Sequence, residues 1–369
     1  MKKLIKTVCF TFIFLQLSYP VMFSQTLHKN IFEQPKPKSY VCYRSDKVIN
    51  IDGRIDDEIW EKTEWTDEFV DIEGTLKPLP RFKTKVKMLW DDNYLYIAAK
   101  LDEPHVWAKL KQRDTIIFFD NDFEVFLDPN GDTHQYFEFE MNAYNTVWDL
   151  LLVRPYRDQG SAINGWNYNN IKTAVFVKGS LNNPDDIDDY WSLEIAIPWV
   201  DLMDCAETDV PPKNGQQWRI NFSRVEWQTE VKNGTYEKVI NPATKRPFPE
   251  DNWVWSPQGV VNMHLPEMWG FLQFSDKPAG SEVVKFVYNK DEDAKWALRQ
   301  IYYEQIRFFE KNKKFASSLK ELGLTKLKID DFTINNKIQT TKNLFEASIV
   351  NDKMKYSFII FQDGKIIKK

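Results

Sequence analysis

The sequence has little of what most metal, nucleotide and nucleic-acid sites are built from. Its 369 residues include three Cys and four His, and no two histidines stand at a short metal-binding spacing. No glycine-rich phosphate loop is present, and no serine or cysteine nucleophile with a nearby base can be picked out. The net charge is −5, with Lys and Arg spread along the chain, so we expect no basic face for nucleic acid.

Long apolar runs are also scarce, and the one that stands out lies at the N-terminus. Three lysines precede an apolar stretch from Val8 to Leu15, which is the order of a secretory signal. We predict a signal peptide over 1–25, with an uncleaved anchor as the alternative, and a polar spacer over 26–40. No other segment is expected to span a membrane, so the mature protein is expected to be exported: periplasmic, cell-surface or extracellular. Export permits a disulfide between Cys42 and Cys205, and two free thiols are the alternative.

Residues 41–276 are dominated by apolar residues at every second position, which predicts β-strands. The segment 85–101 alternates on both sides of Asp91-Asp92-Asn93 and is typical of a β-hairpin. Many short strands separated by Asp, Asn, Gly and Pro favour a mainly β fold, an antiparallel, jelly-roll-like β-sandwich. The tryptophans that stand in phase with other apolar residues are expected in its core: Trp60, Trp90, Trp191 and Trp218. A short helix is expected at 55–64, capped by Asp52 or Asp56.

The pattern changes after residue 276. Residues 291–322 carry apolar side chains at helical spacing and begin with acids, so they predict a helix that ends at Gly323. Strand-like segments follow it, and the last of them turns at Asp363-Gly364. We therefore predict a small C-terminal α+β domain over 277–369, in which no catalytic constellation is visible.

Several ordered motifs between residues 48 and 274 resemble the family 9 carbohydrate-binding modules, which are β-sandwich domains often attached to secreted glycan-degrading enzymes. Each motif is short, and their number, order and spacing carry the resemblance. They are INIDGRIDDEIW, VKMLWDDNYLYIAAKLDEP, DNDFEVFLDPNGD, YWSLEIAIPWVDL, GQQWRINFSRVEW and WSPQGVVNMHLPEMWGFLQF.

The resemblance implies a sugar site in which two aromatic rings enclose a sugar and a strand glutamate binds its hydroxyls. Glu124 of DNDFEVF matches that glutamate. The first stacking position falls on Phe118 or Phe119. The second falls near Met263 or His264, where this sequence has no Trp. Glu140 stands where family members can offer a basic side chain, and Asn142 follows on the same face.

Two further features accompany the implied site. Trp166 belongs to no apolar pattern and lies in the long connection 154–170, so it is either a second stacking ring or a ring packed over the sheet. Since the family tends to carry structural calcium, the turn with Asp128, Asn130 and Asp132 is either a calcium site or an ordinary polar turn.

The sequence therefore predicts an exported, non-catalytic protein that binds a polysaccharide or oligosaccharide, with secreted glycan-degrading enzymes as further partners. The high aromatic content, 15% with 14 Trp, agrees with a sugar ligand. A glycoside hydrolase is the first alternative, because the family occurs in such enzymes. The carboxylates available for it, Glu138 and Glu140, lie about 7 Å apart on one strand face, whereas catalytic acids flank a bond from opposite sides. A haem-binding redox module is the second, with Met141, Met263 and His264 as the available ligands.

Overall fold

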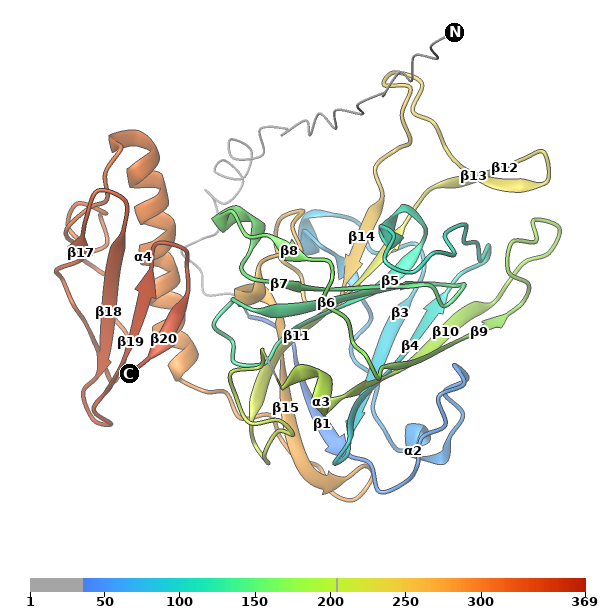
Figure 1. Cartoon of the computed structure of the whole chain (residues 1–369), viewed down its shortest axis with the longest axis horizontal. Coiled ribbons are helices and arrows are strands. Elements are labelled where there is room, and N and C mark those ends of the chain that lie inside the picture. Colours follow the sequence, from blue (N-terminus) through green and yellow to red (C-terminus); the bar gives the residue numbers. More distant parts are fainter. Residues whose placement is uncertain (1–35, 204) are drawn as a thin grey trace, which may run out of the picture. The chain divides into compact units, whose positions relative to one another are not determined.

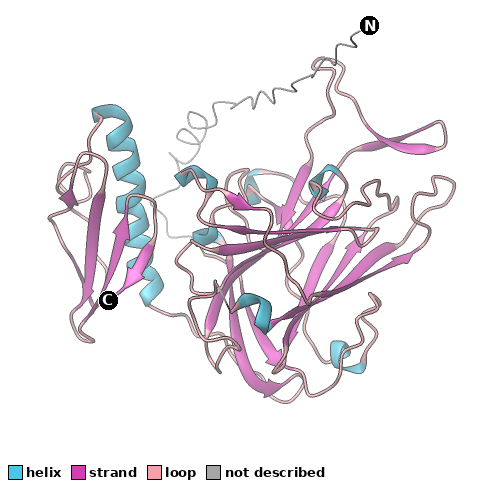
Figure 2. Ribbon diagram, in the orientation of Figure 1, coloured by secondary structure: helices cyan, strands magenta, loops and turns pink. Residues whose placement is uncertain are grey.

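The computed structural model describes residues 36–203 and 205–369. The predicted signal segment and most of the predicted spacer lie outside these ranges. Strands dominate the described residues, and α4 (Asp291–Asn312) is the long helix (Figure 2). None of the described helices combines the length and the apolar character needed to cross a membrane.

Thirteen strands form one sheet that is bent into the two halves of a sandwich (Figure 1). The first half contains, in spatial order, β8 (Ala162–Ile163), β7 (Val147–Leu152), β6 (Tyr136–Asn142), β5 (Asp122–Asp128), β11 (Gln217–Glu226) and β15 (Gly270–Pro278). The second half contains β1 (Ser39–Arg44), β3 (Thr84–Trp90), β4 (Tyr94–Asp102), β10 (Tyr190–Pro198) and β9 (Lys172–Lys178). Two short strands lie off this path: β14 (Asp251–Val254) pairs with β11, and β2 (Val70–Asp71) pairs with β14. Neighbouring strands are antiparallel except that β1 runs parallel to both β15 and β3.

The period-two pattern predicts the core correctly. Phe123, Val125 and Leu127 of β5 point inward and meet side chains of the second half such as Ile97 and Ile195 in one hydrophobic cluster. This is the expected mainly β sandwich. The four tryptophans predicted to be core residues are all buried: Trp60, Trp90, Trp191 and Trp218.

Short elements and a separate hairpin connect the strands. The hairpin is formed by β12 (Thr229–Lys232) and β13 (Thr235–Lys238). The short helices are α2 (Glu58–Glu61), α3 (Trp199–Leu202), and the 3-10 turns η1 (Gly74–Leu76), η2 (Ile117–Phe119), η3 (Tyr156–Asp158) and η4 (Pro266–Met268). The predicted caps of α2 were wrong: Asp57 occupies the N-cap position, and its carboxylate accepts from the backbone of Asn50 rather than from the helix.

The C-terminal residues form their own sheet of β16 (Phe332–Ile334), β17 (Gln339–Thr340), β18 (Phe345–Asn351), β19 (Tyr356–Phe361) and β20 (Ile366–Lys368), against which α4 packs (Figure 1). The predicted α+β composition is therefore present. The predicted end of the helix was wrong. The helix ends at Asn312, and Lys313 adopts the left-handed conformation that closes it. Lys313 lies ten residues before the predicted stop at Gly323.

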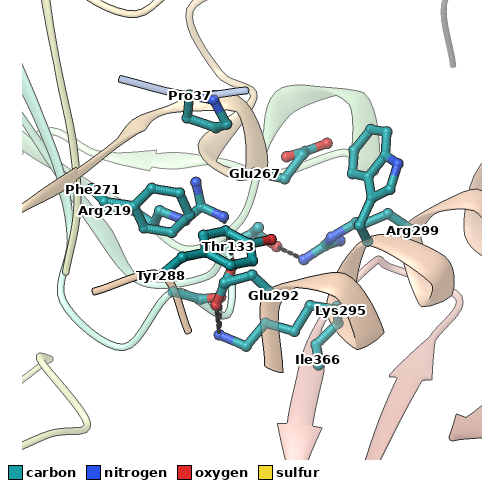
Figure 3. Close-up of a pocket in the computed structure, with 12 residues that line it drawn as sticks. Pro37, Thr133, Arg219, Glu267, Phe271, Tyr288, Glu292, Lys295, Arg299 and Ile366 are labelled. Atoms are coloured by element: carbon teal, nitrogen blue, oxygen red, sulfur yellow. Dashed lines mark hydrogen bonds and ion pairs between the residues drawn. The ribbon is translucent and has the colours of Figure 1, made fainter. Parts of the chain in front are cut away.

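Charged side chains join α4 to the sandwich (Figure 3). Arg219 of β11 forms an ion pair of 2.5 Å with Glu292, and Lys295 lies 2.9 Å from the same carboxylate. Arg299 donates a 2.8 Å hydrogen bond to the hydroxyl of Thr133, which follows β5. The C-terminal segment is thus fixed to the sandwich by specific polar contacts.

Cys42 and Cys205, for which the sequence allowed a disulfide, do not form one. Cys42 lies in the hydrophobic core of the sandwich, and burial raises the pKa of its thiol well above the ordinary value.

Candidate functional site

The outer face of the first half of the sheet carries a group of acids. Side chains alternate along a strand, so the residues between the core positions of β5 and β6 share the opposite face. Glu124 stands directly opposite Glu140 across the ladder, and Asp122 stands opposite Asn142. Glu138 lies on the same face, one alternate position from Glu140. We call Asp122, Glu124, Glu138 and Glu140 the acidic face.

The acidic face is buried rather than solvated. Glu124 is 5% exposed and Glu140 1%, although the resemblance implies that both positions face a ligand. Burial raises the pKa of Glu124 to about 7. Burial, followed by the negative charge of Glu124, raises the pKa values of Asp122, Glu138 and Glu140 well above the ordinary range. The charged form of each acid is therefore disfavoured by its surroundings.

The predicted stacking rings lie at the edge of this face, in η2. The backbone N–H of Phe118 donates a 3.1 Å hydrogen bond to Oε2 of Glu140, so the turn is tied to the acids. The Phe118 ring packs against a small apolar cluster that includes Trp107 and Trp227. Phe119 is the accessible ring, with 51% of its surface exposed. Of the two candidates, Phe119 is thus the ring that a ligand can reach.

A second exposed ring lies on the other side of the acids. Tyr156 of η3 is 48% exposed, and its ring centroid lies 4.4 Å from that of His264. Burial raises the pKa of Tyr156, and the charges of Glu138 and Glu140 raise it further, as expected for a hydroxyl near these acids. The sequence pointed to the connection 154–170 that contains Tyr156, but to a different ring in it. The sequence feature that could have indicated Tyr156 is its position between Arg154 and Arg157.

Trp166, the ring expected from that connection, lies elsewhere. Its centroid is 5.0 Å from Phe137 and 4.5 Å from Tyr168, and both of these residues belong to the core between the two halves of the sheet. Trp166 therefore covers the edge of the core on the inner side of β6, away from Glu140. Of the two expectations for Trp166, this place agrees with a ring packed over the sheet and not with a second stacking ring, because the alternation of β6 separates the two faces.

His264 lies at the acidic face. Its Nδ1 is 2.8 Å from the hydroxyl of Tyr136, and its ring meets Phe126 edge to face. Burial, followed by the positive charge of Arg157, lowers the pKa of His264 to about 3. The imidazole is thus neutral at physiological pH.

Asn142 is brought to the acidic face but is fully engaged there. Its amide group donates to the carbonyl of Leu110 at 2.9 Å and to Asp120 at 3.0 Å. Its carbonyl accepts from the backbone N–H groups of Tyr144 and Thr146. With no exposed surface and every polar atom paired, Asn142 holds the η2 connection in place rather than facing a ligand.

The polar turn after β5 uses its oxygens within the protein. The two carboxylate oxygens of Asp128 accept from the backbone of Gly131 and Thr133, both at 2.9 Å. Asn130 accepts from the backbone of Asp132, and Asp132 lies 3.1 Å from the ammonium group of Lys365. These are the contacts of a closed polar turn, and calcium binding there stays a prediction.

The fold shows where the residues named for the two alternative functions lie. Met141 belongs to the core cluster, whereas Met263 belongs to the cluster on the outer face with Phe126 and Tyr136. The methionines named for a haem are thus separated by the sheet. The hydrolase alternative needs two carboxylates on opposite sides of a bond, and Glu138 and Glu140 share one face of β6.

Comparison with known proteins agrees with the motifs. The sequence model of the family described as "Carbohydrate family 9 binding domain-like" matches residues 51–273, which is more than half of the chain. The chain belongs to this family.

Two curated relatives match part of this chain. Exoglucanase XynX of Acetivibrio thermocellus is 28% identical over 152 residues, which are 41% of this chain and 12% of the relative. Endo-1,4-beta-xylanase A of Thermoanaerobacterium saccharolyticum is 28% identical over 165 residues, 45% of this chain and 11% of the relative. The matched region thus spans about a tenth of the length of these relatives.

Solved structures of family 9 modules are also similar. The module from Caldicellulosiruptor kristjanssonii in complex with cellotriose is 17% identical, with a TM-score of 0.41, over 67% of this chain and 99% of that one. Its complex with glucose is 18% identical, with a TM-score of 0.41, over 67% of this chain and 100% of that one.

Proposed function

We propose that this protein is an exported, non-catalytic glycan-binding protein whose ligand lies over the acidic face between Phe119 and Tyr156. Membership of the carbohydrate-binding family and two exposed rings at the edges of one buried polar face support this proposal. The predicted signal segment supports export to the periplasm, the cell surface or the medium. Secreted glycan-degrading enzymes are the proposed partners, in line with the names of the curated relatives.

Each part of the face has a distinct role in this proposal. The apolar faces of Phe119 and Tyr156 would stack on the C–H surfaces of a sugar ring. Glu124 and Glu140 would accept or donate hydrogen bonds to its hydroxyls, according to their protonation. A stacked ring and a few charged hydrogen bonds contribute a few kcal/mol, so we expect dissociation constants between about 1 μM and 1 mM.

A glycan-array screen of the full chain tests the proposal, followed by titration of the best glycan. We expect Phe119→Ala and Tyr156→Ala each to weaken binding about 10-fold or more, since each removes a stacking surface. Trp65→Ala is the matched control, because Trp65 is a partly exposed ring under Lys85 and Lys87, on the outer face of the other half.

Three results would contradict the proposal. They are a wild-type protein that binds no glycan, two ring variants that bind as wild type does, and equal losses in the Trp65 control. Release of sugar from a bound glycan would instead favour the hydrolase alternative.

A further inference from the structure

Three carboxylates of the acidic face converge on one point. One oxygen each from Asp122, Glu124 and Glu140 can be chosen so that all three lie within 4.8 Å of one another. Asp122 and Glu124 come from β5 and Glu140 from β6, so the arrangement is held by the strand ladder rather than by a loop. Oxygens that share one calcium ion at about 2.3–2.6 Å lie no more than about 5 Å apart.

Some buried carboxylate oxygens of the acidic face also make no hydrogen bond to another described residue. Asp122 has no exposed surface, and within residues 36–203 and 205–369 neither of its carboxylate oxygens makes a hydrogen bond of ordinary geometry. The backbone of Val225 is near enough to act on its pKa, but it does not offset the effect of burial. Glu138, 6% exposed, likewise has an unpaired Oε2 and interacts electrostatically with Glu124 and Glu140. Buried carboxylate oxygens without partners are costly, and a bound ion is one of the ordinary reasons for their presence.

Lys238, a cationic side chain near these acids, does not occupy the point where the three carboxylates converge. Lys238 of β13 places its ammonium group 3.2 Å from the centre of the Trp227 ring. Burial lowers the pKa of Lys238 to about 8, while Asp122 and other acids act in the opposite direction. Among the described residues, Lys238 makes no ion pair with Asp122, Glu124 or Glu140. The charge of the group is therefore not balanced by a lysine at contact distance.

We propose that Asp122, Glu124 and Glu140 bind a divalent cation of the hard, oxygen-preferring kind, calcium in the first place, on the outer face of the sheet. Three carboxylates supply up to six oxygens, and Glu138 lies on the same face, one alternate position from Glu140. Calcium takes six to eight oxygen ligands at flexible angles, which suits donors fixed on two strands. Magnesium needs shorter, near-octahedral contacts and fits this spread of oxygens less well.

This site differs from the polar turn after β5, where backbone N–H groups and Lys365 already occupy the oxygens of Asp128 and Asp132. A bound cation would also change the protonation state of the acids. Without a cation, repulsion and burial favour protonation, whereas the ion would displace those protons and let all three carboxylates ionise. The inference does not depend on glycan binding, although an ion here would offer open positions to a pair of sugar hydroxyls.

The test is a calorimetric titration of calcium chloride into the full chain at pH 7.5, after treatment with chelator and desalting, with no glycan present. We expect one ion per chain and a higher Tm in calcium than in chelator. Glu140→Gln and Asp122→Asn should each weaken calcium binding about 10-fold or more, because each removes a charged ligand. Glu237→Gln is the matched control, since this exposed glutamate on β13 lies outside the group.

Several outcomes would overturn the proposal. One is the absence of calcium binding, and another is unchanged affinity in both Glu140→Gln and Asp122→Asn. A loss confined to Asp132→Asn would place the ion in the polar turn instead. Circular dichroism verifies that each variant folds. If Glu140→Gln does not fold, Asp122→Asn provides the test, because it leaves the Phe118 hydrogen bond intact. Because the titration contains no glycan, its failure leaves the glycan proposal standing, and a negative glycan screen leaves the calcium proposal standing.

Discussion

Phe118 and Glu140 are joined by a hydrogen bond of 3.1 Å from the backbone N–H of the first to the carboxylate of the second. The bond connects the turn that presents the exposed Phe119 ring to the strand that carries the acids. A change in the charge of Glu140 therefore acts on both the position of the ring and the stability of the sheet.

The first prediction concerns the pH dependence of stability in chelator. The folded-state pKa values of Glu124, about 7, and of Glu140 lie above their ordinary values. Their favourable contribution is therefore complete below about pH 4.3 and is lost as the pH rises through the folded-state values. We expect the Tm of the wild type to fall between pH 5 and pH 8 in thermal scans.

Glu140→Gln checks the cause of this fall. The glutamine side chain can still accept from Phe118 but cannot ionise, so the variant should lose less stability than the wild type between pH 5 and pH 8, and the remaining loss comes from Glu124 and the other buried acids. Glu237→Gln, at an exposed position, should follow the wild type. Equal slopes for wild type and Glu140→Gln would show that Glu140 does not contribute to the fall in this range.

The alternation of the strands made one part of the site predictable from the sequence. A residue between two core positions of β5 has to point outward, so the sequence alone puts Glu124 on the outer face, where it stands opposite Glu140. What covers that face could not be predicted in the same way. Phe118, Tyr156 and His264 reach it from three connections far apart in sequence, and period-two patterns carry no information about where such segments meet.

The choice between Trp166 and Tyr156 illustrates the difference. Both lie in the connection 154–170, and the sequence singled out Trp166 because it belongs to no apolar pattern, either as a stacking ring or as a ring packed over the sheet. In the structure, the connection passes from η3 at the outer face to the inner edge of β6, where Trp166 meets Phe137. The side of the sheet on which each ring lies depends on that path and not on residue type.

The second prediction separates support from ligand contact. Asn142→Ala removes four hydrogen bonds of a fully buried amide and should lower the free energy of unfolding by about 3 kcal/mol in urea titrations. Asn312→Ala, at the exposed end of α4, should cost less than about 1 kcal/mol. Folded Asn142→Ala that binds glycan as tightly as wild type would fit a supporting role, whereas lost binding at full stability would contradict it.

The third prediction compares two glycines with similar backbone conformation. Gly53 and Gly323 have φ of +85° and +73°. A Cβ at Gly53 would lie 2.6 Å from the backbone carbonyl carbon of Val175, while a Cβ at Gly323 meets nothing within 4 Å.

We therefore expect Gly323→Ala to cost about 1–2 kcal/mol for its left-handed backbone alone, and Gly53→Ala to cost clearly more. The Gly53 N–H also donates to Glu194 at 2.8 Å, so a shift of this turn would disturb a second contact. Equal losses of unfolding free energy in the two variants would show that the close approach to Val175 is relieved without cost.

The last prediction concerns a buried ion pair beside the C-terminal helix. Arg157 lies 2.7 Å from Glu267, and both side chains are almost completely buried. Glu267 also accepts a hydrogen bond from the hydroxyl of Tyr303 on α4. Burial alone would raise the pKa of Glu267, but Arg157 and Arg299 outweigh it and lower the pKa to about 2.

Arg157→Met leaves the Glu267 carboxylate buried without its main partner, so we expect a loss of about 3–5 kcal/mol near neutral pH. Lys62→Met, which breaks an exposed pair with Glu58, should cost less than about 1 kcal/mol. The wild-type pair stabilises the protein above the ordinary pKa of a glutamate, and this contribution is lost as the pH falls through about 2. The difference between wild type and Arg157→Met in urea titrations should therefore shrink steadily from pH 5 to pH 2.5. A difference that stays constant over this range would mean that Arg157 stabilises the protein by packing on Tyr302 and Tyr303 rather than by its charge.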